Sequence, residues 1–242
     1  MTIENTTGDS RSVVLAISGA SGAVYSVRLL QQLVALAIPV QLTISNAGCQ
    51  VIEQELGLVV DVDRPSVDEL LGYQVPGCPI LELPPEREVQ VYHYKDLMSP
   101  IASGSHRTYG MVICPCSGGT LGSIAGGISG NLIHRGAEVH LKERRKLIFV
   151  TRETPLSPIA IENMQRVTAA GGIVLPASPG WYHGVQSLGD LVDFVVARIL
   201  DQLEIDNQLI DRWGEGALDV CRSERVRRRL SKAQNNFGDD TV

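Results

Sequence analysis

Aromatic residues are scarce in this sequence, whose 242 residues include three Phe, two Trp and six Tyr. So few rings argue against a platform on which nucleic-acid bases stack. The formal net charge of −6 also argues against general nucleic-acid binding, which relies on a basic surface. No apolar run reaches the roughly 18 residues of a membrane-spanning helix, and the opening MTIENTTGDSRS lacks the apolar core of a signal peptide. We therefore expect a cytoplasmic protein that binds neither nucleic acid nor membrane.

Metal-binding patterns are also missing. The five histidines show no ligand spacing, and no Asp-rich motif is present. The sequence Cys114-Pro115-Cys116 lacks the second ligand pair that a zinc site needs. The remaining cysteines are Cys49, Cys78 and Cys221, and an odd total without a signal peptide favours reduced, inert thiols. We expect no metal cofactor.

Apolar runs alternate with helical patterns along most of the chain. Strands are expected at residues 13–17, 39–44, 111–114, 147–150 and 173–175, with a short one at 89–94. Helices are expected at 24–36, 48–56, 120–125, 157–170 and 188–203. This order predicts an α/β fold, a parallel sheet covered by helices on both faces.

We expect one domain over residues 13–205, after a flexible N-terminus at 1–12. Residues 206–242 form a C-terminal extension whose end we expect to be disordered. It contains Arg222, Arg225 and the run 227–229. Such a basic run is more often a solvated face than a site, although it could bind an acidic partner.

A glycine-rich turn, Gly19-Ala20-Ser21-Gly22, joins the first strand to the first helix. Backbone N–H groups in such a turn can hold a phosphate, although the turn could also use glycine for its geometry alone. It is neither a full G-x-G-x-x-G motif nor a Walker A motif. The second strand ends in Ser45 and offers no carboxylate for a ribose, which favours a mononucleotide such as FMN over NAD.

Two further stretches are rich in small donors, residues 99–105 and 116–122. Ligands of open parallel sheets bind at the carboxyl ends of the strands. We expect these loops to meet the first one at that edge.

The block 141–155 places Lys142, Arg144, Arg145, Arg152 and Glu153 around one apolar strand. Such cations can hold a second anion, and a carboxylate can transfer a proton. Arg152 and Glu153 could instead form a simple ion pair, and Arg144 and Arg145 are better interpreted as solvated or interfacial. Arg198 lies between apolar neighbours, where an anion is a reasonable partner.

Several of these segments together resemble the UbiX flavin prenyltransferases. They are ISGASGA, ASGS, CPCSGGTL, NLIHRGAEVHLKERRKLI, VTRETP, LPASPGWYH and LVDFVVARILDQL, between Val13 and Trp213. The resemblance implies a flavodoxin-like Rossmann fold, a three-layer sandwich that binds reduced FMN. It implies transfer of a dimethylallyl group from dimethylallyl phosphate to N5 and C6 of FMN, without a metal. It also implies delivery of prenylated FMN to UbiD-type decarboxylases and a homo-oligomer, typically a dodecamer.

The resemblance also assigns residues. FMN would be held by Gly19, Ala20, Ser21, Ser45, Ser103, Gly104, Ser105, Ser117, Thr120 and Arg135. Dimethylallyl phosphate would be bound, partly across subunit interfaces, by Lys142, Arg152, Tyr182, Arg198 and Trp213. The catalytic set would be Glu153, Arg152, Lys142 and Glu55, with Glu55 reaching a neighbour's site. Some family members have Trp where this chain has Leu97, which changes one wall of the prenyl pocket.

Two other functions remain open on the same fold. An FMN-dependent cysteine decarboxylase would carry a PASANT-type segment, and this chain has CPCSGGT there instead. His106 could serve as the base of that enzyme. A non-catalytic subunit that stores FMN would use the charges only structurally.

Overall fold

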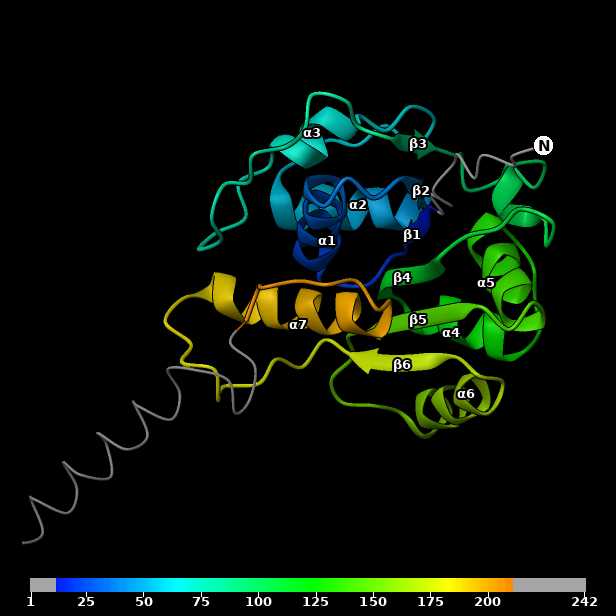
Figure 1. Ribbon diagram of the computed structural model, residues 1–242. Helices are drawn as coiled ribbons and strands as arrows, with labels where there is room; N and C mark the ends of the chain where they lie inside the picture. The colour runs from blue at the N-terminus through cyan, green and yellow to red at the C-terminus, as the bar shows by residue number, and fades with distance from the viewer. Residues whose placement is uncertain (1–11, 211–242) are drawn as a thin grey trace, which may run out of the picture.

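Six parallel strands form the centre of the computed structural model, which describes residues 12–210 (Figure 1). They are β1 (Val13–Ile17), β2 (Val40–Ile44), β3 (Val89–Val91), β4 (Gly110–Cys116), β5 (Lys146–Thr151) and β6 (Ile173–Pro176). The order across the sheet is β3-β2-β1-β4-β5-β6. Without the short edge strand β3, the order of the five others is that of flavodoxin-like sheets. The expected α/β fold is confirmed.

Within residues 12–210, seven α-helices and one short 3₁₀ helix accompany these strands. They are α1 (Ala23–Ala35), α2 (Asn46–Leu56), α3 (Val67–Gly72), η1 (Pro100–Ala102), α4 (Gly118–Ala125), α5 (Leu132–Lys142), α6 (Pro158–Ala169) and α7 (Leu188–Gln202). In the part of the chain that the structure describes, no helix is long and apolar enough to cross a membrane.

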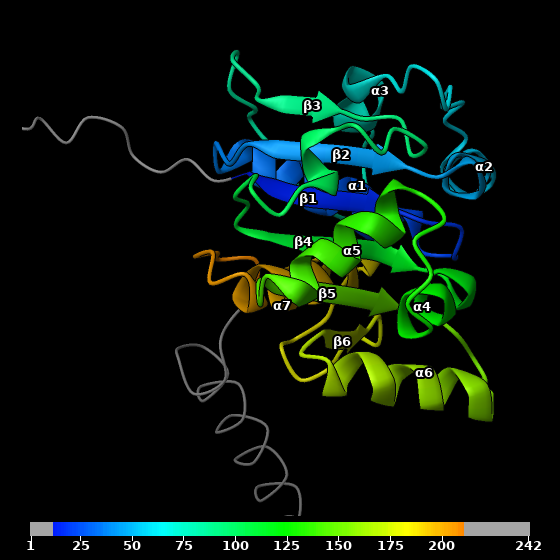
Figure 2. The ribbon, with the colours of Figure 1, turned by 90° about the vertical axis from the view of Figure 1, so that its right-hand side faces the viewer.

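Each central strand contributes alternate side chains to two separate cores. Val13, Leu15 and Ile17 pack with α1, α3 and α7 on one face, whereas Val14 and Ala16 pack with α4, α5 and α6 on the other. All five residues of β1 are buried, as expected for a parallel strand covered on both sides. Figures 1 and 2 show these two helical layers on opposite faces of the sheet.

Two helices and one strand differ from the sequence predictions. Helices α3 and α5 were not predicted, and β3 ends at Val91 rather than at residue 94. The order in which strands are added to the sheet reverses at β1. The chain places β2 on one side of β1 and β4 on the other side. Such a switch point opens a crevice at the carboxyl ends of the strands.

Candidate active site

The loops after β1 and β4 are tied together at this switch point. Ser18 Oγ donates to the carbonyl of Pro115 (2.9 Å) and accepts from the backbone N–H of Ser117 (2.8 Å). Ser18 was not in the set of residues assigned to FMN, although its position directly after a buried strand was a usable signal. Its buried hydroxyl fixes the spacing between two of the loops that were expected to bind a phosphate.

Helices α1, α2 and α4 directly follow β1, β2 and β4 at this edge, and two of these three carry a serine cap. Ser45 Oγ accepts from Gly48 N at the start of α2 (3.0 Å), and Ser117 Oγ accepts from Thr120 N at the start of α4 (3.2 Å). Figure 2 shows α2 and α4 at the end of the sheet to which the strand arrows point. Helix N-termini carry unpaired N–H groups and partial positive charge, so they attract anions.

The third helix, α1, is capped by a residue from α2. Gly22 at its N-cap has φ 115° and makes no side-chain cap of its own. Instead, the Glu55 carboxylate accepts from Gly22 N (2.9 Å) and Ala23 N (2.8 Å). The resemblance implied that Glu55 reaches a neighbour's site, whereas the structure places its carboxylate on the first loop of its own chain.

Arg152 joins the same edge from the end of β5. Its Nε donates to the carbonyl of Ser21 (3.3 Å), and its charge also acts on Tyr25 of α1. Burial raises the pKa of Tyr25, and Arg152 partly opposes that increase. Among the described residues, Arg152 forms no ion pair with Glu153, whose side chain is exposed. The alternative of a simple structural pair is therefore not supported.

The other cations of the charged block lie at the opposite edge. Lys142 ends α5 before β5 begins, and its Nζ pairs with Glu143 (3.0 Å). A six-residue strand rises about 20 Å, so β5 separates Lys142 from Arg152 by roughly that length. The block is thus two charge groups rather than one cluster.

The loop 103–105 also lies near Lys142, not at the carboxyl edge as expected. A Cβ added to Gly104 would lie 3.0 Å from Lys142 Nζ, and Arg145 donates to the carbonyls of Gly104 (2.5 Å) and His106 (2.6 Å). The reason is topological, because this loop leads into the amino end of β4. Arg145 therefore has a defined structural role at this corner.

The remaining assigned residues are placed elsewhere in the chain. Arg135 on α5 donates to the carbonyl of Ala102 (3.2 Å) and pairs with Glu138 (3.0 Å). Arg198 on α7 pairs with Asp201 (2.8 Å) and lines a hollow of about 230 Å³ with β6. Tyr182 packs edge-on against Phe194, which lines the same hollow. Trp213 lies outside the described residues.

Comparison with known proteins identifies the family. A family model described as Flavoprotein matches residues 1–200. The flavin prenyltransferase UbiX of Pseudomonas aeruginosa is 45% identical over 203 residues, which cover 84% of this chain and 94% of that protein. The UbiX of Halalkalibacterium halodurans is 44% identical over 201 residues, which cover 83% and 92%. The chain belongs to the UbiX flavin prenyltransferase family.

Solved structures agree with this membership. AnUbiX (PadA1), in complex with FMN and dimethylallyl pyrophosphate, has a TM-score of 0.71 and 35% identity, covering 86% of this chain and 99% of that one. A dodecameric FMN-dependent UbiX-like decarboxylase from Escherichia coli O157:H7 has a TM-score of 0.71 and 32% identity, covering 84% and 100%. The cypemycin decarboxylase CypD, at 11% identity and a TM-score of 0.51, shares the fold alone.

The rival cysteine decarboxylase gains no support from this UbiX-family chain. His106, the proposed base of that rival, contacts Gln41 near the start of β2 (2.6 Å between Nε2 atoms). It therefore lies away from the carboxyl edge. Burial lowers the pKa of His106, and Arg145 lowers it further.

The described thiols of this UbiX-family chain are free and buried, as predicted. Burial raises the pKa of Cys49 and of Cys78 to about 11, and it raises the pKa of Cys114 and Cys116 as well. Within residues 12–210, no three His, Cys, Asp or Glu side chains are grouped so that they could hold a metal ion. Leu97, at the position of a Trp in some family members, is 48% exposed.

Proposed function

We propose that this protein transfers a dimethylallyl group from dimethylallyl phosphate to N5 and C6 of reduced FMN. The observation that carries the proposal is that the loops after β1 and β4 are hydrogen-bonded to each other at the switch point, in a chain of the UbiX family. There, Ser18 connects two donor-rich loops and Arg152 contacts the glycine turn. AnUbiX, a structural relative, was solved with FMN and dimethylallyl pyrophosphate.

The residues at this edge fit a flavin phosphate. A Cβ added to Gly118 or Gly119 would meet nothing within 4 Å, so the start of α4 borders open space. Backbone N–H groups there, with those of Gly19 and Ser21 in the turn, can supply donors to a phosphate. The N–H of Ala20 donates to the carbonyl of Ser18 (2.9 Å), and those of Gly22 and Ala23 donate to Glu55. Ser45, Ser117 and Thr120 complete the proposed set. Bound reduced FMN would supply the nucleophilic ring that takes the prenyl group.

Cleavage of the dimethylallyl carbon–oxygen bond releases phosphate, so positive charge must meet the leaving group. Arg152 is the cation that this chain supplies at the switch point. Lys142, Tyr182 and Arg198 lie at other surfaces of the same chain. We assign these three to the site of a neighbouring copy, together with Ser103, Gly104, Ser105 and Arg135, in a homo-oligomer like the E. coli dodecamer.

Glu153 is assigned to proton transfer. Closure of the new ring onto C6 displaces a proton from that carbon, and a carboxylate within reach can accept it. Glu153 follows Arg152 on the carboxyl side of β5, and its exposed side chain is available to a ligand. The prenylated flavin would then serve a UbiD-type decarboxylase in the cytoplasm.

The test is the mass of the flavin released after anaerobic incubation with reduced FMN and dimethylallyl phosphate. We expect a flavin heavier by one prenyl unit, formed only when both substrates are present. A reaction without the prenyl donor is the control. The proposal fails if the protein binds FMN and returns it unmodified, or if it binds NAD in preference to FMN.

A further inference from the structure

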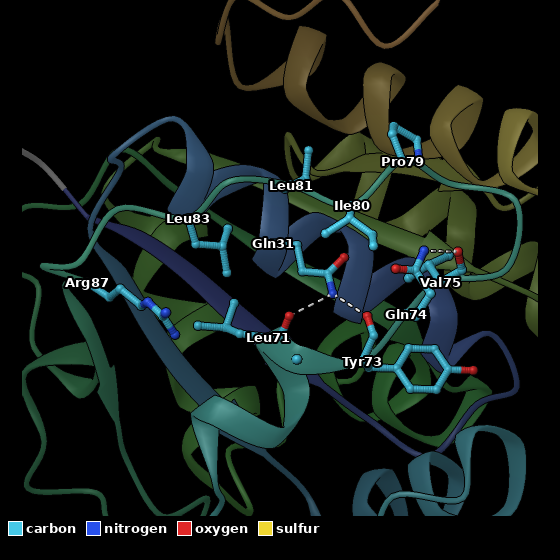
Figure 3. A pocket seen from close by; sticks show the side chains of 11 residues that line it. Gln31, Leu71, Tyr73, Gln74, Val75, Pro79, Ile80, Leu81, Leu83 and Arg87 are labelled. Carbon is cyan, nitrogen blue, oxygen red and sulfur yellow. Dashed lines mark hydrogen bonds between the residues drawn. The ribbon is translucent and has the colours of Figure 1, made fainter.

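A second pocket is lined by residues of α1, α3 and the segment 73–87, and none of them belongs to the loops at the switch point (Figure 3). Its volume is about 270 Å³, and its lining includes Gln31, Leu71, Tyr73, Ile80, Leu81 and Leu83. Gln31 Nε2 donates to the carbonyls of Leu71 (3.1 Å) and Tyr73 (2.7 Å). These bonds fix the pocket floor, while the proposed prenyl transfer uses none of its residues.

The pocket has both polar and apolar lining residues, and its surroundings are acidic. Ile80, one of the lining residues, is 83% exposed, so its apolar side chain is available to a docked segment. The surrounding segment, residues 57–88, carries seven exposed carboxylates against two arginines. Arg87 lies at one end of the pocket, but it already pairs with Asp68 (3.2 Å) and donates to the carbonyl of Pro84 (3.2 Å).

The sequence contains a segment of complementary character. Residues 222–232, RSERVRRRLSK, hold six cations and one glutamate, with Val226 and Leu230 between them. This segment lies beyond residue 200, where the family model ends. The eleven residues between Ile210 and Arg222 can span up to about 40 Å when extended, so the segment is not confined to the neighbourhood of Ile210.

We propose that the C-terminal segment 222–232 docks on this pocket. Its arginines face the carboxylates of Glu82, Glu86 and Glu88, and its apolar residues cover Ile80. Opposite charge favours this occupant over a second copy of the pocket, because two acidic surfaces repel each other. The segment comes from the same chain or from a neighbouring copy, and both cases satisfy the proposal.

The test uses the full chain with a photo-crosslinking amino acid in place of Ile80. After irradiation at low salt, peptide mass spectrometry should find residues 222–232 joined to position 80. The same amino acid at Met98, which is 93% exposed in another part of the chain, is the matched control. In 1 M salt, where the screening length is about 3 Å, the crosslink at position 80 should largely disappear.

Charge exchange makes the test specific. The triple variant Arg227→Glu, Arg228→Glu, Arg229→Glu should lower the crosslink yield about tenfold, because three attractive contacts become repulsive. Adding Glu82→Arg, Glu86→Arg and Glu88→Arg should restore it. The proposal is overturned if neither set of substitutions changes the crosslink yield. It is also overturned if position 80 crosslinks only to another region of the chain or to another protein. None of these readouts depends on prenyl transfer.

Discussion

Glu153 directly follows Arg152 at the end of β5, and its side chain is exposed. We expect Glu153→Gln to slow formation of prenylated FMN by about 10²–10⁴-fold, because an amide of the same shape cannot accept the proton. FMN affinity should not change, since Glu153 is outside the proposed flavin set. The measurement is product formation by mass spectrometry alongside FMN titration.

Arg152→Ala is the informative comparison for that variant. It removes the charge that meets the leaving phosphate, so it should raise the KM for dimethylallyl phosphate as well as lower turnover. Wild-type turnover of Glu153→Gln would remove Glu153 from the proton-transfer step and leave Arg152 as the sole assignment at this position.

Gly19 lets the first loop pass very close to the start of α2, where a larger residue would not fit. A Cβ at this position would lie 2.4 Å from the Cβ of Ala47 at the start of α2. We expect Gly19→Ala to displace the loop, weaken FMN binding and lower the free energy of unfolding by about 1–3 kcal/mol, the usual cost of overpacking. Urea unfolding and FMN titration measure the two effects.

The control for this substitution is Gly72→Ala, because a Cβ at Gly72 meets nothing within 4 Å. That variant should keep both FMN affinity and stability close to wild type. If Gly19→Ala also behaves like wild type, the close approach of the loop to α2 is not required for binding.

At the element scale, the order of strands and helices could be predicted from apolar runs and their spacing. The continuous run Val13–Ile17 indicates a strand buried on both faces, which the sheet confirms. Helix α5 was not predicted, although its apolar residues Leu132, Ile133 and Ala137 pack on the sheet. The helical spacing of these apolar residues is sufficient to predict the helix.

The candidate site was only partly predictable, because sequence proximity does not reveal which end of a strand a residue occupies. Lys142 and Arg152 are near neighbours in sequence, but β5 runs between them. Likewise, the donor-rich loop 103–105 resembles the other phosphate loops, although it precedes a strand rather than following one. By contrast, the loops at Gly19, Ser45 and Ser117 follow strands and were correctly placed at the carboxyl edge.

Helix α5 is fastened to the segment before β4 by a buried histidine. His140 Nε2 lies 2.8 Å from Thr108 Oγ1, and its Nδ1 lies 2.7 Å from the carbonyl of Gly136. Burial lowers the pKa of His140 to about 4, from an ordinary value of 6.5. Between pH values of about 4 and 6.5, His140 is therefore protonated in the unfolded chain but neutral in the folded chain. Stability should fall as pH drops from about 6.5 to about 4.

The size of this effect is of the order of 3 kcal/mol, since each pKa unit corresponds to about 1.4 kcal/mol. Denaturant unfolding from pH 7 to pH 4 measures it, with His140→Gln as the comparison. The variant should be less stable at pH 7 but show a shallower decline. Because burial also lowers the pKa of His106 and His134, the difference between the two slopes is the quantity that reports on His140. Equal slopes would contradict the assignment.

On the scale of the whole molecule, one chain presents its proposed catalytic residues on separate surfaces. Arg152 and the glycine turn lie at the carboxyl edge, Lys142 lies at the amino edge, and Arg198 lies against β6. Since β5 separates Arg152 from Lys142 by roughly 20 Å, one chain cannot bring both cations to one dimethylallyl phosphate. The proposed site would then take residues from at least two copies, as closed symmetric assemblies allow.

Subunit complementation tests this arrangement. Lys142→Ala and Arg152→Ala should each abolish most activity when expressed alone, because each removes one cation from every site. Co-expressed with different affinity tags and purified through both, the two variants should recover activity. Random mixing leaves both cations intact in about one quarter of sites, provided that they come from different copies. A mixed oligomer as inactive as its parents would mean that both residues act within the same chain, and would contradict the shared site. The double variant, carried on one chain and mixed with itself, provides the baseline, because no arrangement of its copies restores a complete pair.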